Sequence, residues 1–175
     1  MAKTRGIAFG SETYDGQFQR TLLASYAGMA DLGEAFATAR QVGKPDPDRW
    51  YNAWFGRAES VRETAEAAVA AGHRESARGA YLRAAEYYRQ SYFFLRRDLN
   101  DPSLQRAYAA QVASFTAALP LMDLPVETLA VPYAGTTLKA YFFVQLAVQG
   151  VFWRLFGVDS PLRKLPGILI DSASP

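Results

Sequence analysis

The spacing of apolar residues along this chain changes once, and the change falls at Pro125. Before Pro125, apolar side chains recur every three or four residues, which is the period of one face of an α-helix. After it, residues 126–131 alternate along the chain with a period of two, which is the period of a β-strand. The chain therefore predicts a mainly α fold, in which a bundle of helices is followed by a small β element.

Four helical patterns fill residues 17–124, and we expect them to form a four-helix bundle. The first ends at Gly43 and Pro45, and the second and fourth each begin with an Asp-Pro pair, at Asp46 and Asp101. Aspartate caps a helix, and proline fits the first helical position. The four patterns cover residues 17–42, 46–72, 75–95 and 101–119. The buried face predicted for the fourth consists of Leu104, Tyr108, Val112, Phe115 and Leu119.

Residues 125–143 predict a β-hairpin. A first strand runs to Val131, a turn follows at residues 132–135, and a second β-prone run extends from Thr137 to Phe143. Runs of this kind on either side of a glycine-containing turn are typical of paired antiparallel strands. On either side of this ordered part, residues 1–16 form a loose lead-in. Residues 144–175 form a divergent tail, whose apolar stripe over 144–158 predicts a C-terminal helix.

Composition excludes several classes of function. A net charge of +2 without a basic run does not suit nucleic acid. The absence of cysteine excludes disulfides and thiolate metal sites, and fits a cytoplasmic location. A two-metal site in a helical bundle needs paired Glu-x-x-His motifs, and His73 is the only histidine, so Glu59, Glu63 and Glu66 predict a solvated face instead. Arg154 argues against a membrane span over residues 140–158.

Four segments of the sequence together resemble one group of α/β-hydrolases. They are residues 50–54 (WYNAW), Gly72, residues 76–89 (SARGAYLRAAEYYR) and residues 131–143 (VPYAGTTLKAYFF). The group consists of enzymes with a helical N-terminal cap, such as the FrsA-like esterases, the pseudooxynicotine C–C hydrolases and the fungal polyketide-shortening hydrolases. The resemblance covers residues 17–143. It implies that the helices are a cap and that the hairpin is the start of the hydrolase sheet.

The same resemblance implies a Ser-His-Asp enzyme that acts on an ester, amide or C–C bond of a small organic substrate, without a cofactor. In that family the serine stands in a G-x-S-x-G elbow. No serine of this chain has that context, and His73 precedes the family's catalytic region. No catalytic residue carries over, so we expect a hydrolase by family that is inactive as this chain. Because the pattern is lost after Phe143, we interpret the tail as the product of a truncated or frame-shifted reading frame.

Five aromatic residues are the candidates for lining a substrate pocket. They are Trp50 and Trp54 in the second helical pattern, and Tyr81, Tyr88 and Tyr92 in the third. Aromatic residues at helical spacing most often form a core. In a cap domain the two roles overlap, because the inner face of the cap closes the active site and excludes water.

Two further readings stay open beside the hydrolase cap. The spacing of Gly72, Ala77, Tyr81 and Ala84 resembles a tetratricopeptide repeat, which would make the chain a protein-interaction module. Such arrays need at least three copies of about 34 residues, and a second copy is not apparent. A membrane-associated protein held by residues 144–156 rests on composition alone. A cap without its catalytic domain would also expose an apolar face, through which we expect self-association.

Overall fold

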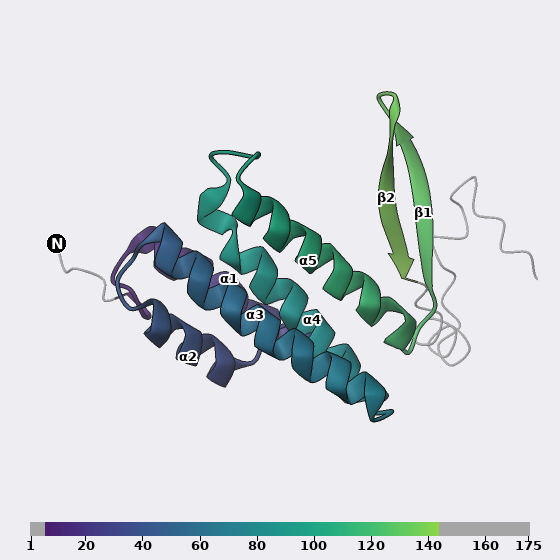
Figure 1. Ribbon diagram of the computed structural model, residues 1–175, viewed down its shortest axis with the longest axis horizontal. Coiled ribbons are helices and arrows are strands. Elements are labelled where there is room, and N and C mark those ends of the chain that lie inside the picture. Colours follow the sequence, from purple (N-terminus) through teal and green to yellow (C-terminus); the bar gives the residue numbers. More distant parts are fainter. Residues whose placement is uncertain (1–5, 144–175) are drawn as a thin grey trace, which may run out of the picture. The chain divides into compact units, whose positions relative to one another are not determined.

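The structure is a computed structural model that describes residues 6–143. They fall into two compact units, which are divided between Asp123 and Leu124. The first unit is a bundle of helices and the second is a two-stranded antiparallel hairpin (Figure 1). The predicted fold class, mainly α with a hairpin after the helices, is therefore confirmed. The helix predicted for residues 144–158 lies outside the described residues.

The helical unit is built around one central helix, α4. It lies between α3 and α5, while α2 packs on α3, and α1 contacts both α2 and α4 (Figure 1). The α-helices are α1 (Glu12–Ala24), α2 (Leu32–Val42), α3 (Pro47–Ala70), α4 (Arg74–Ser91) and α5 (Pro102–Ala118). Three single 3-10 turns accompany them: η1 (Ser25–Ala27), η2 (Phe93–Leu95) and η3 (Leu119–Leu121).

The prediction of one helix over residues 17–42 is wrong, because the structure has two helices there, α1 and α2. Gly28 ends the turn η1 in the left-handed conformation, with φ at 70°. The chain then restarts at Asp31, whose side chain accepts a hydrogen bond from the backbone N–H of Glu34 at 2.8 Å. The break, at residues 25–31, begins inside the seven-residue gap between Leu22 and Met29 in the apolar pattern. The described residues thus contain five α-helices rather than four.

The two Asp-Pro helix starts are confirmed. Asp46 accepts a hydrogen bond from Arg49 N at 2.9 Å, and Asp101 accepts one from Ser103 N at 2.7 Å. Pro47 and Pro102 are the first residues of α3 and α5. Each carboxylate satisfies a backbone N–H that has no partner within the helix, which fixes where the helix begins.

The face that α5 buries differs from the predicted one. Tyr108 and Val112 are exposed, at 55% and 40% of their surface. Leu104 is buried as predicted, Phe115 and Leu119 are half-buried, and the other buried residues of α5 are Ala107, Ser114 and Ala118. These three are small, and the facing helix α4 also buries alanines. Small side chains let two helices approach closely, and this approach turns Tyr108 and Val112 outward.

The lead-in was expected to be loose, but its described part is fixed to the helical unit. The carboxylate of Asp15 accepts hydrogen bonds from the backbone N–H groups of Ala8 (2.8 Å), Phe9 (2.9 Å) and Ser11 (3.1 Å). The ring of Phe9 lies 5.4 Å from that of Trp50. Burial raises the pKa of Asp15, but the backbone donors outweigh it and hold the pKa below its usual range.

Replacing Asp15 by asparagine should therefore destabilise the helical unit by about 2 kcal/mol at neutral pH. A carboxyl group with a lowered pKa in the folded state contributes stability above its unfolded pKa of about 4, and this contribution is lost as the pH falls through the folded pKa. Urea unfolding at pH 7 and pH 3 measures both effects. The exposed Glu12→Gln variant is the control, and a D15N variant as stable as this control at pH 7 would contradict the role of Asp15.

The second unit matches the predicted hairpin. Its strands are β1 (Val126–Tyr133) and β2 (Thr136–Phe143), joined by the two-residue loop Ala134-Gly135. Both loop residues have positive φ, 43° at Ala134 and 78° at Gly135. Positive φ at both positions is the type I′ geometry that matches the twist of paired strands.

Ala134 is the one non-glycine residue with positive φ among residues 6–143. Asparagine tolerates this conformation better than alanine, and Asn-Gly is the preferred type I′ pair. We therefore expect Ala134→Asn to stabilise the hairpin by up to about 1 kcal/mol. Slower hydrogen exchange of the β1 and β2 amides, with no change in α1 to α5, would show this. Faster exchange of those amides would contradict it.

Candidate functional site

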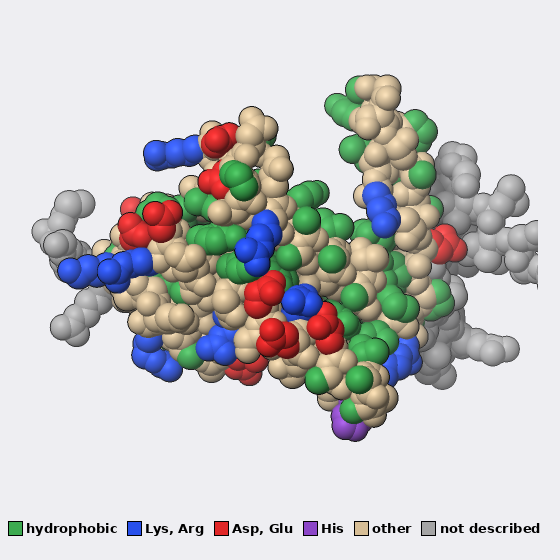
Figure 2. Space-filling model, viewed as in Figure 1, with side chains coloured by type: hydrophobic (Ala, Val, Ile, Leu, Met, Phe, Trp, Pro, Cys, Tyr) green, Lys and Arg blue, Asp and Glu red, His purple; other side chains and the backbone are tan. Residues whose placement is uncertain are grey.

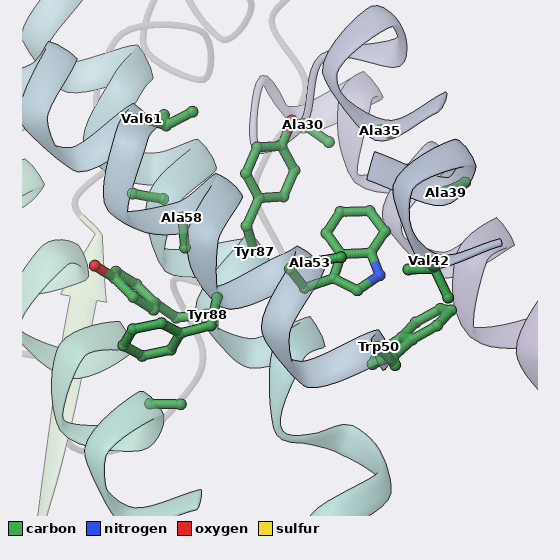
Figure 3. Packing of buried hydrophobic residues seen from close by; sticks show 14 of the residues in the cluster. Ala30, Ala35, Ala39, Val42, Trp50, Ala53, Ala58, Val61, Tyr87 and Tyr88 are labelled. Atoms are coloured by element: carbon green, nitrogen blue, oxygen red, sulfur yellow. The ribbon is translucent and has the colours of Figure 1, made fainter. Parts of the chain in front are cut away.

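The helical unit contains an aromatic core centred on α3. Trp50 and Trp54 lie one turn apart and are fully buried, with ring centroids 5.6 Å from each other. Phe18 of α1 packs on Trp54 at 6.4 Å, and Tyr87 of α4 packs on the same ring at 5.5 Å. Figure 3 shows Trp50 and Tyr87 in this core, together with alanines of α2 and α3 that belong to the same cluster. The packing of α1, α2 and α4 thus converges on the two tryptophans.

The five aromatic residues predicted to line a pocket do not share one surface. Trp50, Trp54 and Tyr88 are fully buried, whereas Tyr81 and Tyr92 are half-buried. Trp54 packs on Tyr87, which the sequence reasoning did not single out, and the ring of Tyr88 faces Phe55 at 5.4 Å instead. The structure therefore gives the two tryptophans and Tyr88 a place in the core.

Tyr87 fastens α4 to α2 through its hydroxyl group. The hydroxyl donates to Glu34 Oε2 at 2.8 Å and accepts from the backbone N–H of Asp31 at 2.9 Å. Arg83 Nε donates to the same carboxylate oxygen at 3.2 Å. Burial raises the pKa of Tyr87 above its usual range, and the hydrogen bond to Glu34 adds to the effect. The phenol is therefore kept neutral and acts as a donor.

Tyr88 fastens α4 to α3 in a similar way. Its hydroxyl donates to Glu59 and accepts from Arg62 Nε at 3.2 Å, and Arg62 also pairs with Glu59 and Glu66. Burial raises the pKa of Tyr88 above its usual range. Burial also acts to raise the pKa of Glu59, but the hydrogen bonds that Glu59 accepts from Tyr88 and Arg62 outweigh it and lower this pKa. Glu63 and Glu66 are exposed, as predicted for a solvated face, whereas Glu59 is half-buried and binds Tyr88 of the neighbouring helix.

A third polar cluster is buried between α1 and α4. Glu86 is 5% exposed, pairs with Arg89 and accepts a hydrogen bond from Thr21 Oγ1 at 3.0 Å. Gln90, one turn along α4, donates to Thr21 Oγ1 at 2.7 Å and to the backbone oxygen of Gln17 at 2.6 Å. The backbone oxygen of Gln90 accepts from Trp50 Nε1 at 2.8 Å. This cluster joins α1, α3 and α4 at a single point.

The sequence analysis did not predict these three clusters, and one signal points to the two that contain Tyr87 and Tyr88. α4 carries these two tyrosines next to each other, and neighbouring residues of a helix face different sides. Two large aromatic residues in succession therefore indicate a helix buried on two sides. The first cluster ties α2 to α4, the second ties α3 to α4, and the third ties both α1 and α3 to α4, so all three position helices.

His73 is the remaining residue that the sequence analysis considered for a catalytic role. The side chain of His73 is exposed at the start of α4 and makes no capping hydrogen bond. It lines an open depression of about 430 Å³ with Arg74, Glu75 and Ser76.

Within residues 6–143 no group of three or more His, Asp or Glu side chains is placed to bind a metal ion. Over the same residues, no helix has the length and hydropathy needed to cross a bilayer.

Comparison with characterised proteins identifies hydrolases of fungi as relatives of this chain. It is 38% identical over 125 residues to the 20-hydroxy-prefusarin hydrolase of Gibberella moniliformis, an alignment that covers 71% of this chain and 30% of that protein. It is 35% identical over 132 residues to an α/β-hydrolase of Xenoacremonium sinensis, which covers 75% and 31% respectively. A family model that matches the chain was not found.

A third relative extends the similarity further along the chain. A hydrolyase of Aspergillus clavatus is 33% identical over 167 residues, and the alignment covers 91% of this chain and 36% of that protein. An alignment of that length necessarily includes residues beyond Phe143. The chain spans about a third of the length of these relatives. The resemblance to α/β-hydrolases seen in the sequence is thus confirmed, for a part of their length.

Proposed function

We propose that this chain supplies the helical cap and the first two strands of an α/β-hydrolase, because it is homologous to about a third of the length of fungal α/β-hydrolases. The observation that carries this proposal is the order of its elements, five packed helices followed by a type I′ hairpin, in a chain whose relatives are named hydrolases. A tetratricopeptide array is a weaker proposal, because the described helices form no repeated pair of equal length.

The hairpin has the features of the edge of a larger sheet. An isolated two-stranded hairpin is marginally stable, and one face of this one carries exposed Leu129, Val131, Leu138 and Phe142. The two residues that flank the two-residue loop, Tyr133 and Thr136, form a hydrogen-bonded pair. Hydrogen-bonded and non-hydrogen-bonded pairs alternate along antiparallel strands, so the next pair, Pro132 and Thr137, is not hydrogen-bonded. The ring nitrogen of Pro132 therefore lies on the outer edge of β1. Proline blocks strand addition there. A third strand would therefore pair with β2.

In this proposal the helical unit covers an active site and excludes water from it, while residues outside the helical unit form that site. A cap excludes water and so strengthens the electrostatic interactions that act on the reacting bond. The substrate would be a small organic molecule, as the name of the Gibberella relative indicates for that enzyme. No cofactor is proposed, and a cysteine-free chain is in keeping with the cytoplasm. Of the five aromatic candidates, Tyr81 and Tyr92 are only partly buried and are therefore the two that could contact a substrate.

An esterase assay tests whether the chain lacks catalytic residues of its own. The chain has no G-x-S-x-G sequence and a single histidine, His73, which is exposed, so we expect it to lack the serine–histidine pair that such hydrolysis requires. We expect p-nitrophenyl acetate to be cleaved by the 175-residue chain no faster than by the heat-denatured chain. Turnover that copurifies with the folded protein, and that a His73→Ala variant loses, would overturn the proposal.

A further inference from the structure

The end of the helical unit is held against the start of α4. The turn η3, which follows α5, packs on both α4 and α5. Arg74 Nη2 donates to the backbone oxygen of Met122 at 2.5 Å, and Arg78, one turn along α4, pairs with Asp123. In Figure 2 the purple side chain of His73, the residue before α4, marks this end of the unit. Two arginines of one helix thus hold the last two residues of the unit, an arrangement that we name the arginine clamp.

Arg78 is held more firmly than an ordinary surface arginine. Its Nη2 donates to Glu75 of the same helix, and its Nη1 donates to Asp123. The side chain of Arg78 is only 21% exposed, whereas those of Glu75 and Asp123 are 66% and 65% exposed. A single exposed ion pair contributes little, because both side chains lose freedom when they pair. Here Glu75 already orders the guanidinium, so less freedom is lost when Asp123 binds.

The chain has few free rotations immediately after the arginine clamp. The ring of Pro125 fixes its own φ and keeps the preceding residue, Leu124, extended. β1 begins at Val126, where pairing with β2 fixes the backbone. Between the clamped Asp123 and the proline, the main free rotations are therefore the ψ of Asp123 and the φ of Leu124.

We propose that the arginine clamp makes Met122 and Asp123 part of the rigid helical unit, and that Leu124 is the pivot about which this unit moves relative to the chain that follows. The inference rests on the function proposed above, since a cap opens to admit a substrate and closes over it. Hinges are short stretches that absorb changes in φ and ψ. Without the clamp, residues 122–125 would bend together, and the cap would have no defined axis of movement.

Nuclear magnetic resonance of the isotope-labelled 175-residue chain tests this proposal. An Arg74→Gln/Arg78→Gln variant removes both arginines, and Asp123→Asn weakens one contact without changing any helical residue. The matched control, Arg49→Gln/Arg97→Gln, removes two positive charges from exposed positions elsewhere in the helical unit. Backbone order parameters and residual dipolar couplings are measured. The amide signals of α3 and α4 report whether each variant is folded.

The order parameters test the clamp. In the unmodified chain and in the control, we expect those of Met122 and Asp123 to equal those of α5, at about 0.85. In Arg74→Gln/Arg78→Gln they should fall below about 0.6, with a smaller loss in Asp123→Asn. Values already this low in the unmodified chain, or values unchanged in the folded Arg74→Gln/Arg78→Gln variant, would overturn the clamp.

The dipolar couplings test the pivot. Those of Met122 and Asp123 should fit the same alignment as α1 to α5, whereas those of β1 and β2 should need a separate, weaker alignment because rotation at Leu124 averages them. One common alignment for helices and strands would show that Leu124 is not a pivot. Neither readout involves hydrolysis, so a result against the clamp or the pivot would overturn this inference and leave the cap function standing.

Discussion

Replacing Trp50 by alanine is expected to lower the free energy of unfolding of the helical unit by about 3–5 kcal/mol. Trp50 is fully buried, and its ring contacts Phe9, Tyr14 and Phe94 as well as Trp54. Truncation removes these contacts and leaves a cavity where the N-terminal segment and the turn η2 meet α3. It also removes the hydrogen bond from Nε1 to the backbone oxygen of Gln90. Urea unfolding followed by circular dichroism measures the loss.

Phenylalanine at the two tryptophan positions separates packing from hydrogen bonding. Both indoles are fully buried, but Trp54 Nε1 has no hydrogen-bond partner among the described residues. Trp54→Phe removes a buried donor that is unsatisfied, whereas Trp50→Phe removes one that is bonded. We therefore expect Trp50→Phe to cost about 1–2 kcal/mol more than Trp54→Phe. Equal losses would show that the bond to Gln90 contributes nothing to stability.

Replacing Glu86 by alanine should lower the free energy of unfolding by about 3–5 kcal/mol, as much as Trp50→Ala does. Glu86 is 5% exposed and pairs with Arg89, whose own pKa is raised by this contact. Removing the carboxylate leaves a partly buried guanidinium without its partner. It also removes the acceptor of the Thr21 hydroxyl in the cluster that joins α1 to α4. Thermal unfolding monitored at 222 nm would measure the effect.

The control for this variant lies on the same helix. Glu75 and Arg78 have the same spacing as Glu86 and Arg89, but the side chain of Glu75 is 66% exposed. Arg78 keeps Asp123 as a second partner when Glu75 is removed. An exposed pair contributes at most about 1 kcal/mol, so Glu75→Ala should unfold close to the unmodified chain. A loss as large as that of Glu86→Ala would show that burial is not the deciding factor.

The sequence predicted those parts of the fold that depend on local signals. Asp46 and Asp101 cap helices because each combines a capping side chain with a proline at the next position. The turn was predicted over residues 132–135 because β-prone runs lie on either side of it, whereas the structure pairs Pro132 and Tyr133 in β1 and leaves only Ala134 and Gly135 in the loop. The break between α1 and α2 was missed, because Gly28 and Asp31 lie in a stretch whose outer residues still follow helical spacing.

The arrangement of side chains was harder to predict, because it depends on distant contacts. The sequence shows that Tyr88 and Trp54 lie on apolar faces, but not that Tyr87 is the residue that packs on Trp54. Tyr108 was expected inside because of its spacing from Leu104, whereas close packing of small residues on α4 and α5 turns it outward. The carboxylates of Glu34, Glu59 and Glu86 accept hydrogen bonds from hydroxyl groups that are 53, 29 and 65 positions away in the sequence.

If the helical unit is the cap of an α/β-hydrolase, as proposed above, it should be able to replace the matched third of the Gibberella relative in a domain exchange. The matched third of that enzyme is replaced by the corresponding residues of this chain, and a second form lacks that third altogether. Hydrolysis of the enzyme's own named substrate is compared in the two forms, with circular dichroism as the check on folding. We expect the shortened form to lose activity and the exchanged form to regain at least about a tenth of it. A folded exchange as inactive as the shortened form, or a shortened form with full activity, would contradict the claim.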